Sequence, residues 1–234
     1  MQGVFMDNAE MKIEQIAVIY NDYGTKFGVP RQSGLAPSEV SKIVFCEKYR
    51  DKNALRGIGQ YSHLWLLWGF SENPQTDGWS PTVRPPRLGG NERVGVFATR
   101  SPNRPNPIGL SCVKLEKTAD DGENGTVLFV SGADLKNGTP IYDIKPYLPY
   151  VDSVPGALGG FAEEHKNYKL NVSFADGLCE KIPPEKRDAL TEALALDPRP
   201  SYQNDTQREY GMTFGCTEIK FKVDGENLTV TAVE

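Results

Sequence analysis

The sequence predicts a mainly β protein, with an antiparallel barrel or sandwich followed by a small α+β module. Over the first two-thirds of the chain, short runs rich in β-branched and aromatic residues alternate with turn residues. Few helical stretches intervene, whereas parallel βαβ units would need a long amphipathic crossover between successive strands. The predicted strands are Ile13–Tyr20, Lys42–Cys46, Leu64–Phe70, Val94–Ala98, Ile108–Leu115 and Thr126–Val130.

The last third of the chain reads as a second module. Residues 154–165 are rich in Pro, Gly and Ala, which is typical of a linker or a structured loop between domains. We therefore expect one domain over residues 11–160 and a smaller one over 161–234. A strand is predicted at Leu170–Phe174, and a helix from Pro184 to Leu196, where proline suits the first turn and Asp197-Pro198 ends the helix.

A hairpin is predicted near the C-terminus, because two alternating runs flank a turn dipeptide. The runs are Glu218–Val223 and Leu228–Ala232, and the dipeptide is Asp224-Gly225.

Composition excludes several classes of protein. The first twenty residues carry acidic side chains around only a brief apolar run, so neither a signal peptide nor a presequence is expected. No run approaches membrane-spanning length, and we expect a cytoplasmic protein. The four cysteines form no Cys-x-x-Cys pair, and the two histidines, His63 and His165, have no ligand spacing, so no metal site is predicted.

One segment, residues 96–109, combines prolines, arginines and asparagines that a packed core would not use. Prolines restrict φ and hold the neighbouring polar groups in a nearly fixed arrangement. Taken alone, such a segment is more often an ordinary surface turn. A second segment of the same chemistry lies at residues 81–90, and residues 84–104 contain five arginines and one acid, Glu92, in a chain of net charge −5. This basic window favours a directed site for phosphate or carboxylate.

Several motifs, in order, resemble the TrmO (TsaA-like) tRNA methyltransferases from about Ile16 to Asp152. They are Arg56-Gly57-Ile58, Ser62-His63-Leu64-Trp65, VRPPRLGGN, GVFATRS, RPNPIG, Asp134-Leu135 with GTP, and DIKPYLP, with a further match at Asp197-Pro198-Arg199-Pro200 and Tyr202. The resemblance implies a homodimeric enzyme that uses S-adenosylmethionine to methylate N6 of a threonylcarbamoyl-modified tRNA adenosine beside the anticodon. It also implies a β-barrel in place of a Rossmann sheet.

The resemblance implies a cofactor site made of loops, and the chain has no G-x-G-x-x-G turn of the Rossmann type. Asn137 stands where the family usually has Asp, which makes a direct catalytic role for that side chain doubtful. The implied pocket lies wholly before residue 153. The implied cofactor-binding residues are Pro30, Arg31, Gln32, Ser71, Glu72, Arg100, Leu110, Leu135, Gly138, Thr139 and Pro140.

A general base could remove the proton of the methylated nitrogen, and His63, Asp134 and Asp143 are candidates by residue type. Two of them have a structural alternative: His63 as a hydrogen-bonded barrel residue, and Asp143 as a partner of Lys145 or an arginine. The residue types that bind phosphates and stack on bases also suggest a tRNA-binding set. This set is Arg84, Arg87, Arg104, Lys145, Tyr147, Arg199 and Tyr202.

Two functions follow from these patterns. The first is a tRNA adenosine-N6 methyltransferase that depends on S-adenosylmethionine. The alternative is a non-catalytic protein that binds S-adenosylmethionine or a nucleotide on the same barrel, because the binding residues are more evident than any base.

Overall fold

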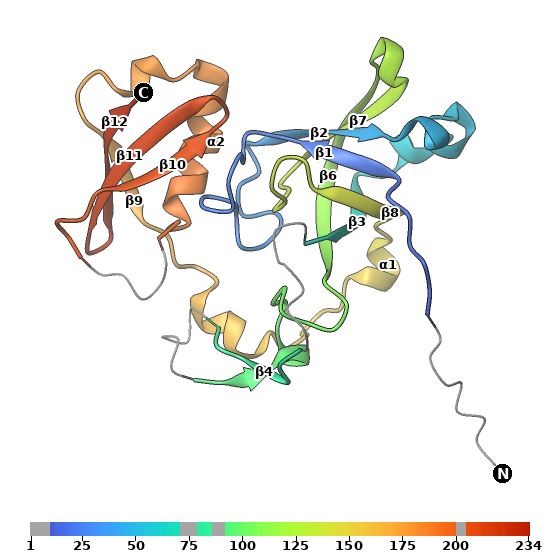
Figure 1. Cartoon of the computed structure of the whole chain (residues 1–234), viewed down its shortest axis with the longest axis horizontal. Coiled ribbons are helices and arrows are strands. Elements are labelled where there is room, and N and C mark those ends of the chain that lie inside the picture. The colour runs from blue at the N-terminus through green and yellow to red at the C-terminus, as the bar shows by residue number, and fades with distance from the viewer. Residues whose placement is uncertain (1–9, 71–78, 86–91, 200–204) are drawn as a thin grey trace.

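Six antiparallel strands close into a barrel in the order β1-β2-β7-β6-β3-β8 (Figure 1). The computed structural model describes residues 10–70, 79–85, 92–199 and 205–234. The predicted mainly β fold with a barrel and few helices is confirmed. The barrel strands are β1 (Ala17–Tyr20), β2 (Val40–Phe45), β3 (His63–Gly69), β6 (Ile108–Asp120), β7 (Thr126–Ser131) and β8 (Pro140–Pro146).

Side chains that point inward from every second strand residue fill the interior of the barrel. On β3, Leu64, Leu66 and Trp68 are buried while the residues between them are half-buried, as a strand with one face on a core requires. The same period places Ser111 and Val113 of β6 inside. The remaining buried core residues are Ala17, Ile19, Ile43, Phe45, Leu128, Val130, Ala133, Leu135 and Ile141.

The structure corrects two features of the predicted barrel. The run Val94–Ala98 is not a barrel strand: only β5 (Val94–Gly95) is extended, and it pairs with β4 (Thr82–Val83) outside the barrel. Val96–Ala98 forms a 3-10 turn, with Phe97 largely exposed. The strand missed by the prediction is β8, which has proline at both ends and pairs with β1 and β3 to close the barrel.

A second sheet, with strand order β10-β11-β12-β9, forms the C-terminal part. Its elements are β9 (Asn171–Phe174), α2 (Pro184–Ala195), β10 (Tyr210–Phe214), β11 (Thr217–Asp224) and β12 (Asn227–Val233), and a short α1 (Pro149–Asp152) precedes them. The helix begins with Pro184 as predicted, and Leu190 and Leu194 are completely buried. The predicted hairpin is confirmed as β11–β12, whereas β10 was not predicted.

The segment between β1 and β2 joins the barrel to the C-terminal sheet. Tyr23 forms an isolated bridge with Phe214 of β10, and Phe27 and Val29 pack against the same C-terminal core. Lys186 of α2 forms an ion pair with Asp22. In Figure 1 this segment runs between the two sheets. The loop after β1 is therefore held by residues that come at least 164 positions later in the chain.

Among the described residues, none of the helices has the length and apolar character needed to cross a membrane.

The hydroxyl of Tyr23 provides a test of this junction. Its oxygen is buried and makes no hydrogen bond within the described residues. Tyr23→Phe removes that unsatisfied group and keeps the ring, so the free energy of unfolding should stay equal or rise. Tyr23→Ala should lower it by about 3–5 kcal/mol, because it leaves a cavity. Urea unfolding followed by circular dichroism measures both, with the exposed Tyr20→Phe as the control; a clear loss in Tyr23→Phe would contradict the prediction.

Candidate functional site

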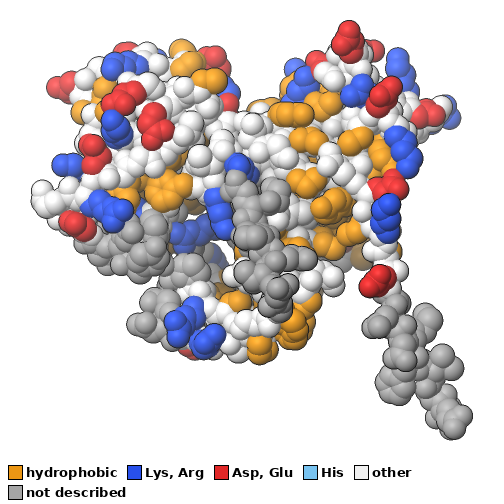
Figure 2. Space-filling model, in the orientation of Figure 1, with side chains coloured by type: hydrophobic (Ala, Val, Ile, Leu, Met, Phe, Trp, Pro, Cys, Tyr) orange, Lys and Arg blue, Asp and Glu red, His pale blue; other side chains and the backbone are white. Residues whose placement is uncertain are grey.

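A cavity of about 1170 Å³ lies at the mouth of the barrel, between the barrel and the C-terminal part. In Figure 2, Lys and Arg side chains gather in the hollow between these two parts. Trp68, at the end of β3, and Phe70 form part of its apolar wall, with ring centroids 4.4 Å apart. Barrel mouths are common ligand sites, because loops converge there on a rigid scaffold.

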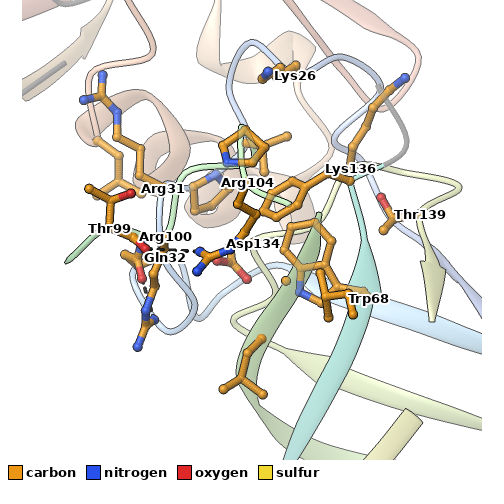
Figure 3. A pocket seen from close by; sticks show the side chains of 18 of the residues that line it. Lys26, Arg31, Gln32, Trp68, Thr99, Arg100, Arg104, Asp134, Lys136 and Thr139 are labelled. Atoms are coloured by element: carbon orange, nitrogen blue, oxygen red, sulfur yellow. Dashed lines mark hydrogen bonds between the residues drawn. The ribbon is translucent and has the colours of Figure 1, made fainter. Parts of the chain in front are cut away.

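Three segments distant in sequence supply residues of the implied cofactor set to this cavity. Pro30, Arg31 and Gln32 come from the loop after β1, Arg100 from the proline-rich segment, and Thr139 from the turn before β8. Arg100 Nη1 donates a hydrogen bond of 2.6 Å to Gln32 Oε1, which joins the first two segments. Figure 3 shows Arg31, Gln32, Thr99 and Arg100 on one side of Asp134, with Trp68, Lys136 and Thr139 on the other.

The other members of the implied cofactor set are distributed around this cavity. Leu110 also lines it and is half exposed. Leu135 is fully buried in the barrel core, where its carbonyl accepts a hydrogen bond from Asn21. Gly138 and Pro140 flank Thr139 without lining the cavity. Ser71 and Glu72 lie outside the described residues.

Asp134 is the candidate base that faces the cavity. It is half-buried, and its Oδ1 accepts a hydrogen bond from the hydroxyl of Ser111 on β6. Desolvation raises the pKa of this carboxyl to about 6, against the opposing effects of Ser111, backbone amides and the charge of Arg100. A carboxylate with such a pKa is ionised at neutral pH and can accept a proton there.

Trp68 is placed by a glycine on the neighbouring strand. Trp68 pairs with Gly109 of β6, and a Cβ on Gly109 would lie 2.2 Å from the indole ring. The indole Nε1 donates a 2.9 Å hydrogen bond to Ser111 Oγ. The close approach of ring and backbone therefore requires glycine at position 109.

The other two candidate bases lie away from the cavity. His63 is at the opposite end of β3 from Trp68, five residues or about 17 Å along the strand. There its ring contacts Tyr147, with centroids 6.1 Å apart. Asp143 on β8 forms an ion pair of 2.7 Å with Lys145. Neither these two residues nor their partners line the cavity.

Several cations surround the cavity in this acidic protein. From the predicted tRNA-binding set, Arg84 and Arg104 line it, and Arg104 donates to the carbonyl of Thr99. Arg87 and Tyr202 lie outside the described residues. The cationic side chains that line the cavity are Lys26, Arg31, Arg84, Arg100, Arg104 and Lys136.

The C-terminal part also lines the cavity, which the resemblance did not lead us to expect. Leu196, Asp197 and Pro198 contribute to its wall, and Arg31 donates to the carbonyls of Asp197 and Arg199. Arg199 itself is buried, and its guanidinium binds both oxygens of the Asp197 carboxylate. Burial alone would raise the pKa of Asp197, but Arg199 outweighs it and the pKa is lowered.

Sequence reasoning missed Trp68 and Ser111, although a signal for Ser111 was present. In the run from Ile108 to Val113, Ser111 has the same phase as Val113, so it falls on the barrel interior, where a polar side chain needs a partner. Trp68 had no comparable signal, because an aromatic residue in an apolar strand is typical of core.

In the part of the chain that the structure describes, no group of three His, Cys, Asp or Glu side chains is arranged to hold a metal ion.

Comparison with known proteins agrees with the resemblance seen in the sequence. The family model for the tRNA-methyltransferase O N-terminal domain matches residues 18–153, and that for the TrmO C-terminal domain matches residues 167–234. The chain is 39% identical over 234 residues to the tRNA (adenine(37)-N6)-methyltransferase of Escherichia coli, covering 97% of this chain and 99% of that protein.

Two further relatives extend the comparison. A crystal structure of TrmO from Pseudomonas aeruginosa is similar with a TM-score of 0.78 and 30% identity, covering 98% of this chain and 99% of that one. A Methanothermobacter thermautotrophicus protein named "Probable S-adenosyl-L-methionine-binding protein" is 34% identical over 149 residues, which are 64% of this chain and 98% of that protein. With both family models matched in order, the chain belongs to the tRNA-methyltransferase O family.

Proposed function

We propose that this protein methylates N6 of adenosine 37 in tRNA, using S-adenosylmethionine as the methyl donor. The observation that carries the proposal is the cavity, where an aromatic wall, several cations and one desolvated carboxylate come together. The names of the relatives support the reaction and the position of the base. We further propose that the accepted adenosine carries the threonylcarbamoyl group that the family resemblance implies, and that the protein is a homodimer.

The residues around the cavity fit this cofactor. Trp68 and Phe70 offer aromatic faces to an adenine ring. Arg100 and Arg31 are suited to a carboxylate, because a guanidinium can form paired, charge-assisted hydrogen bonds with it. When bound, S-adenosylmethionine supplies a methyl group on a positively charged sulfur. The cavity is lined by more cationic side chains than the carboxylate of one cofactor molecule needs, and the remaining ones suit the phosphates of tRNA.

The work of the protein in this reaction is alignment and proton removal. The N6 nitrogen forms a bond to the methyl carbon as the carbon–sulfur bond breaks, and the electron pair of that bond stays on sulfur. The nitrogen then carries one proton too many, and the Asp134 carboxylate accepts it. Proline restricts the backbone of the segment that carries Arg100, so this segment needs little reorganisation.

Transfer of a labelled methyl group tests the proposal and separates it from a protein that only binds the cofactor. The substrate is tRNA from cells that lack the gene, and the donor is S-adenosylmethionine with a radioactive methyl group. Label should appear in the RNA, at N6 of adenosine 37. Cofactor binding without any transfer of label would favour the non-catalytic alternative.

Asp134→Asn should lower kcat/KM for methyl transfer by roughly 10²- to 10⁴-fold, because the amide cannot accept the proton. In the wild type, the rate should rise with pH through about 6 and level off above it, since only the ionised carboxyl is active. The matched control is Asp143→Asn, which changes a carboxylate outside the cavity and should keep near wild-type activity. The opposite ranking of the two variants would contradict the assignment of Asp134.

Arg100→Ala should weaken binding of cofactor or tRNA by roughly ten- to a hundredfold, because one charge-assisted hydrogen bond is lost. Calorimetry with each ligand measures the change in Kd. Arg93→Ala is the control, since this arginine belongs to the same basic window but hydrogen-bonds to Thr82 and does not line the cavity. Equal affinities for Arg100→Ala and the wild type would show that Arg100 does not bind either ligand and that residues 96–109 have only a structural role.

Binding of S-adenosylmethionine should be unchanged in excess EDTA, since the described residues contain no metal-ligand cluster. Calorimetry with and without the chelator measures this, and loss of binding on chelation would overturn the prediction.

A further inference from the structure

Two serines inside the barrel each donate a hydroxyl hydrogen to a carboxylate. Ser111 on β6 donates to Asp134, at the wall of the cavity. Ser41 on β2 donates to Glu39 over 2.7 Å, and neither of these two residues lines the cavity. Both serines are completely buried, so the two pairs differ mainly in whether the carboxylate can meet a ligand.

The pair at the cavity has a fixed hydrogen-bond direction. An indole N–H can only donate, so the 2.9 Å hydrogen bond from Trp68 Nε1 makes the Ser111 oxygen an acceptor. The hydroxyl hydrogen of Ser111 is then directed at Asp134 Oδ1. A carboxylate accepts this hydrogen bond best when it is ionised. Trp68, Ser111 and Asp134 thus form a hydrogen-bond chain: Trp68 orients the hydroxyl of Ser111, and that hydroxyl favours the ionised form of Asp134.

Other groups act on the same carboxyl. The backbone amides of Ser33 and of Asp134 itself also donate to it, and the charge of Arg100 favours its ionised form. Tyr23 lies near enough for its own ionisation to be opposed by Asp134. The further cations that line the cavity are Lys26, Arg31, Arg84, Arg104 and Lys136. The hydrogen bond from the hydroxyl of Ser111 is a contact of its own, so its contribution can be removed by substituting Ser111 alone.

We propose that Trp68 and Ser111 are positioning residues that keep Asp134 ionised and aimed into the cavity, so that it can take the proton released by methylation. The proposal rests on the proposed function for its reaction, but the hydrogen-bond chain itself is a property of the free protein. Gly109 also gains a role in this arrangement: because it has no side chain, the indole of Trp68 can lie close to β6 and reach Ser111.

The experiment measures the titration of Asp134 in two ways. Carbon-13 NMR of the labelled carboxyl, identified by its loss in Asp134→Asn, follows protonation in the free protein. The pH dependence of kcat/KM for methyl transfer follows it during catalysis. Ser111→Ala should raise the titration midpoint by about one pH unit in both, as expected for loss of one hydrogen bond to a charged group. Below the midpoint, activity should fall about tenfold relative to wild type.

Two more variants make the result decisive. Trp68→Phe keeps an aromatic ring but leaves the hydroxyl of Ser111 undirected, so its midpoint should move in the same direction by a smaller amount; it also carries the test if Ser111→Ala does not fold. Ser41→Ala, the matched control, should leave the midpoint unchanged. Unchanged midpoints in folded Ser111→Ala and Trp68→Phe would overturn the proposal. Absence of methyl transfer by the wild type would overturn the proposed function. The NMR titration would still test whether Trp68 and Ser111 keep Asp134 ionised.

Discussion

The insertion of the segment after β1 into the C-terminal core is the contact on which the cavity depends. Tyr23, Phe27 and Val29 belong to the first part of the chain, yet they pack with residues of α2 and β10–β12. The next residues, Pro30 to Gln32, lie in the cavity wall, so their position is set by that packing. Burial of several large apolar side chains is worth far more than the polar contacts around it, which is why it controls the placement of the loop.

Gly28 shows how closely this junction is packed. It has a φ of +98°, and a Cβ there would lie 2.4 Å from the terminal methyl of Met212 on β10. A side chain would therefore be strained by the backbone, and the flexible end of the Met212 side chain would also have to move. Just beyond it, Arg31 donates to two carbonyls in the turn after α2. The barrel and the C-terminal part thus share one wall of the cavity.

The cavity combines cationic side chains with an aromatic, apolar wall. Its rim carries cations on a chain of net charge −5, which attracts anionic ligands without general affinity for polyanions. Its inner wall is aromatic and apolar, and there desolvation raises the pKa of Asp134. Ser111 and the backbone amides oppose that rise and keep the carboxyl ionised near neutral pH. A base of intermediate strength results from this balance.

The sequence by itself determined the fold class, most of the strands, helix α2 and the β11–β12 hairpin, because alternation and turn chemistry act over a few residues. It also singled out the basic, proline-rich segment, since Pro and Arg clusters are visible without a structure. Only the tertiary structure decided which carboxylate faces the cavity. Asp134 and Asp143 are alike in type and close in sequence, and closure of the barrel by β8 places one at the cavity wall and the other outside it. Antiparallel pairing of β3 with β6 brings Trp68 and Ser111 together across 43 residues of sequence, a long-range contact that no local pattern encodes.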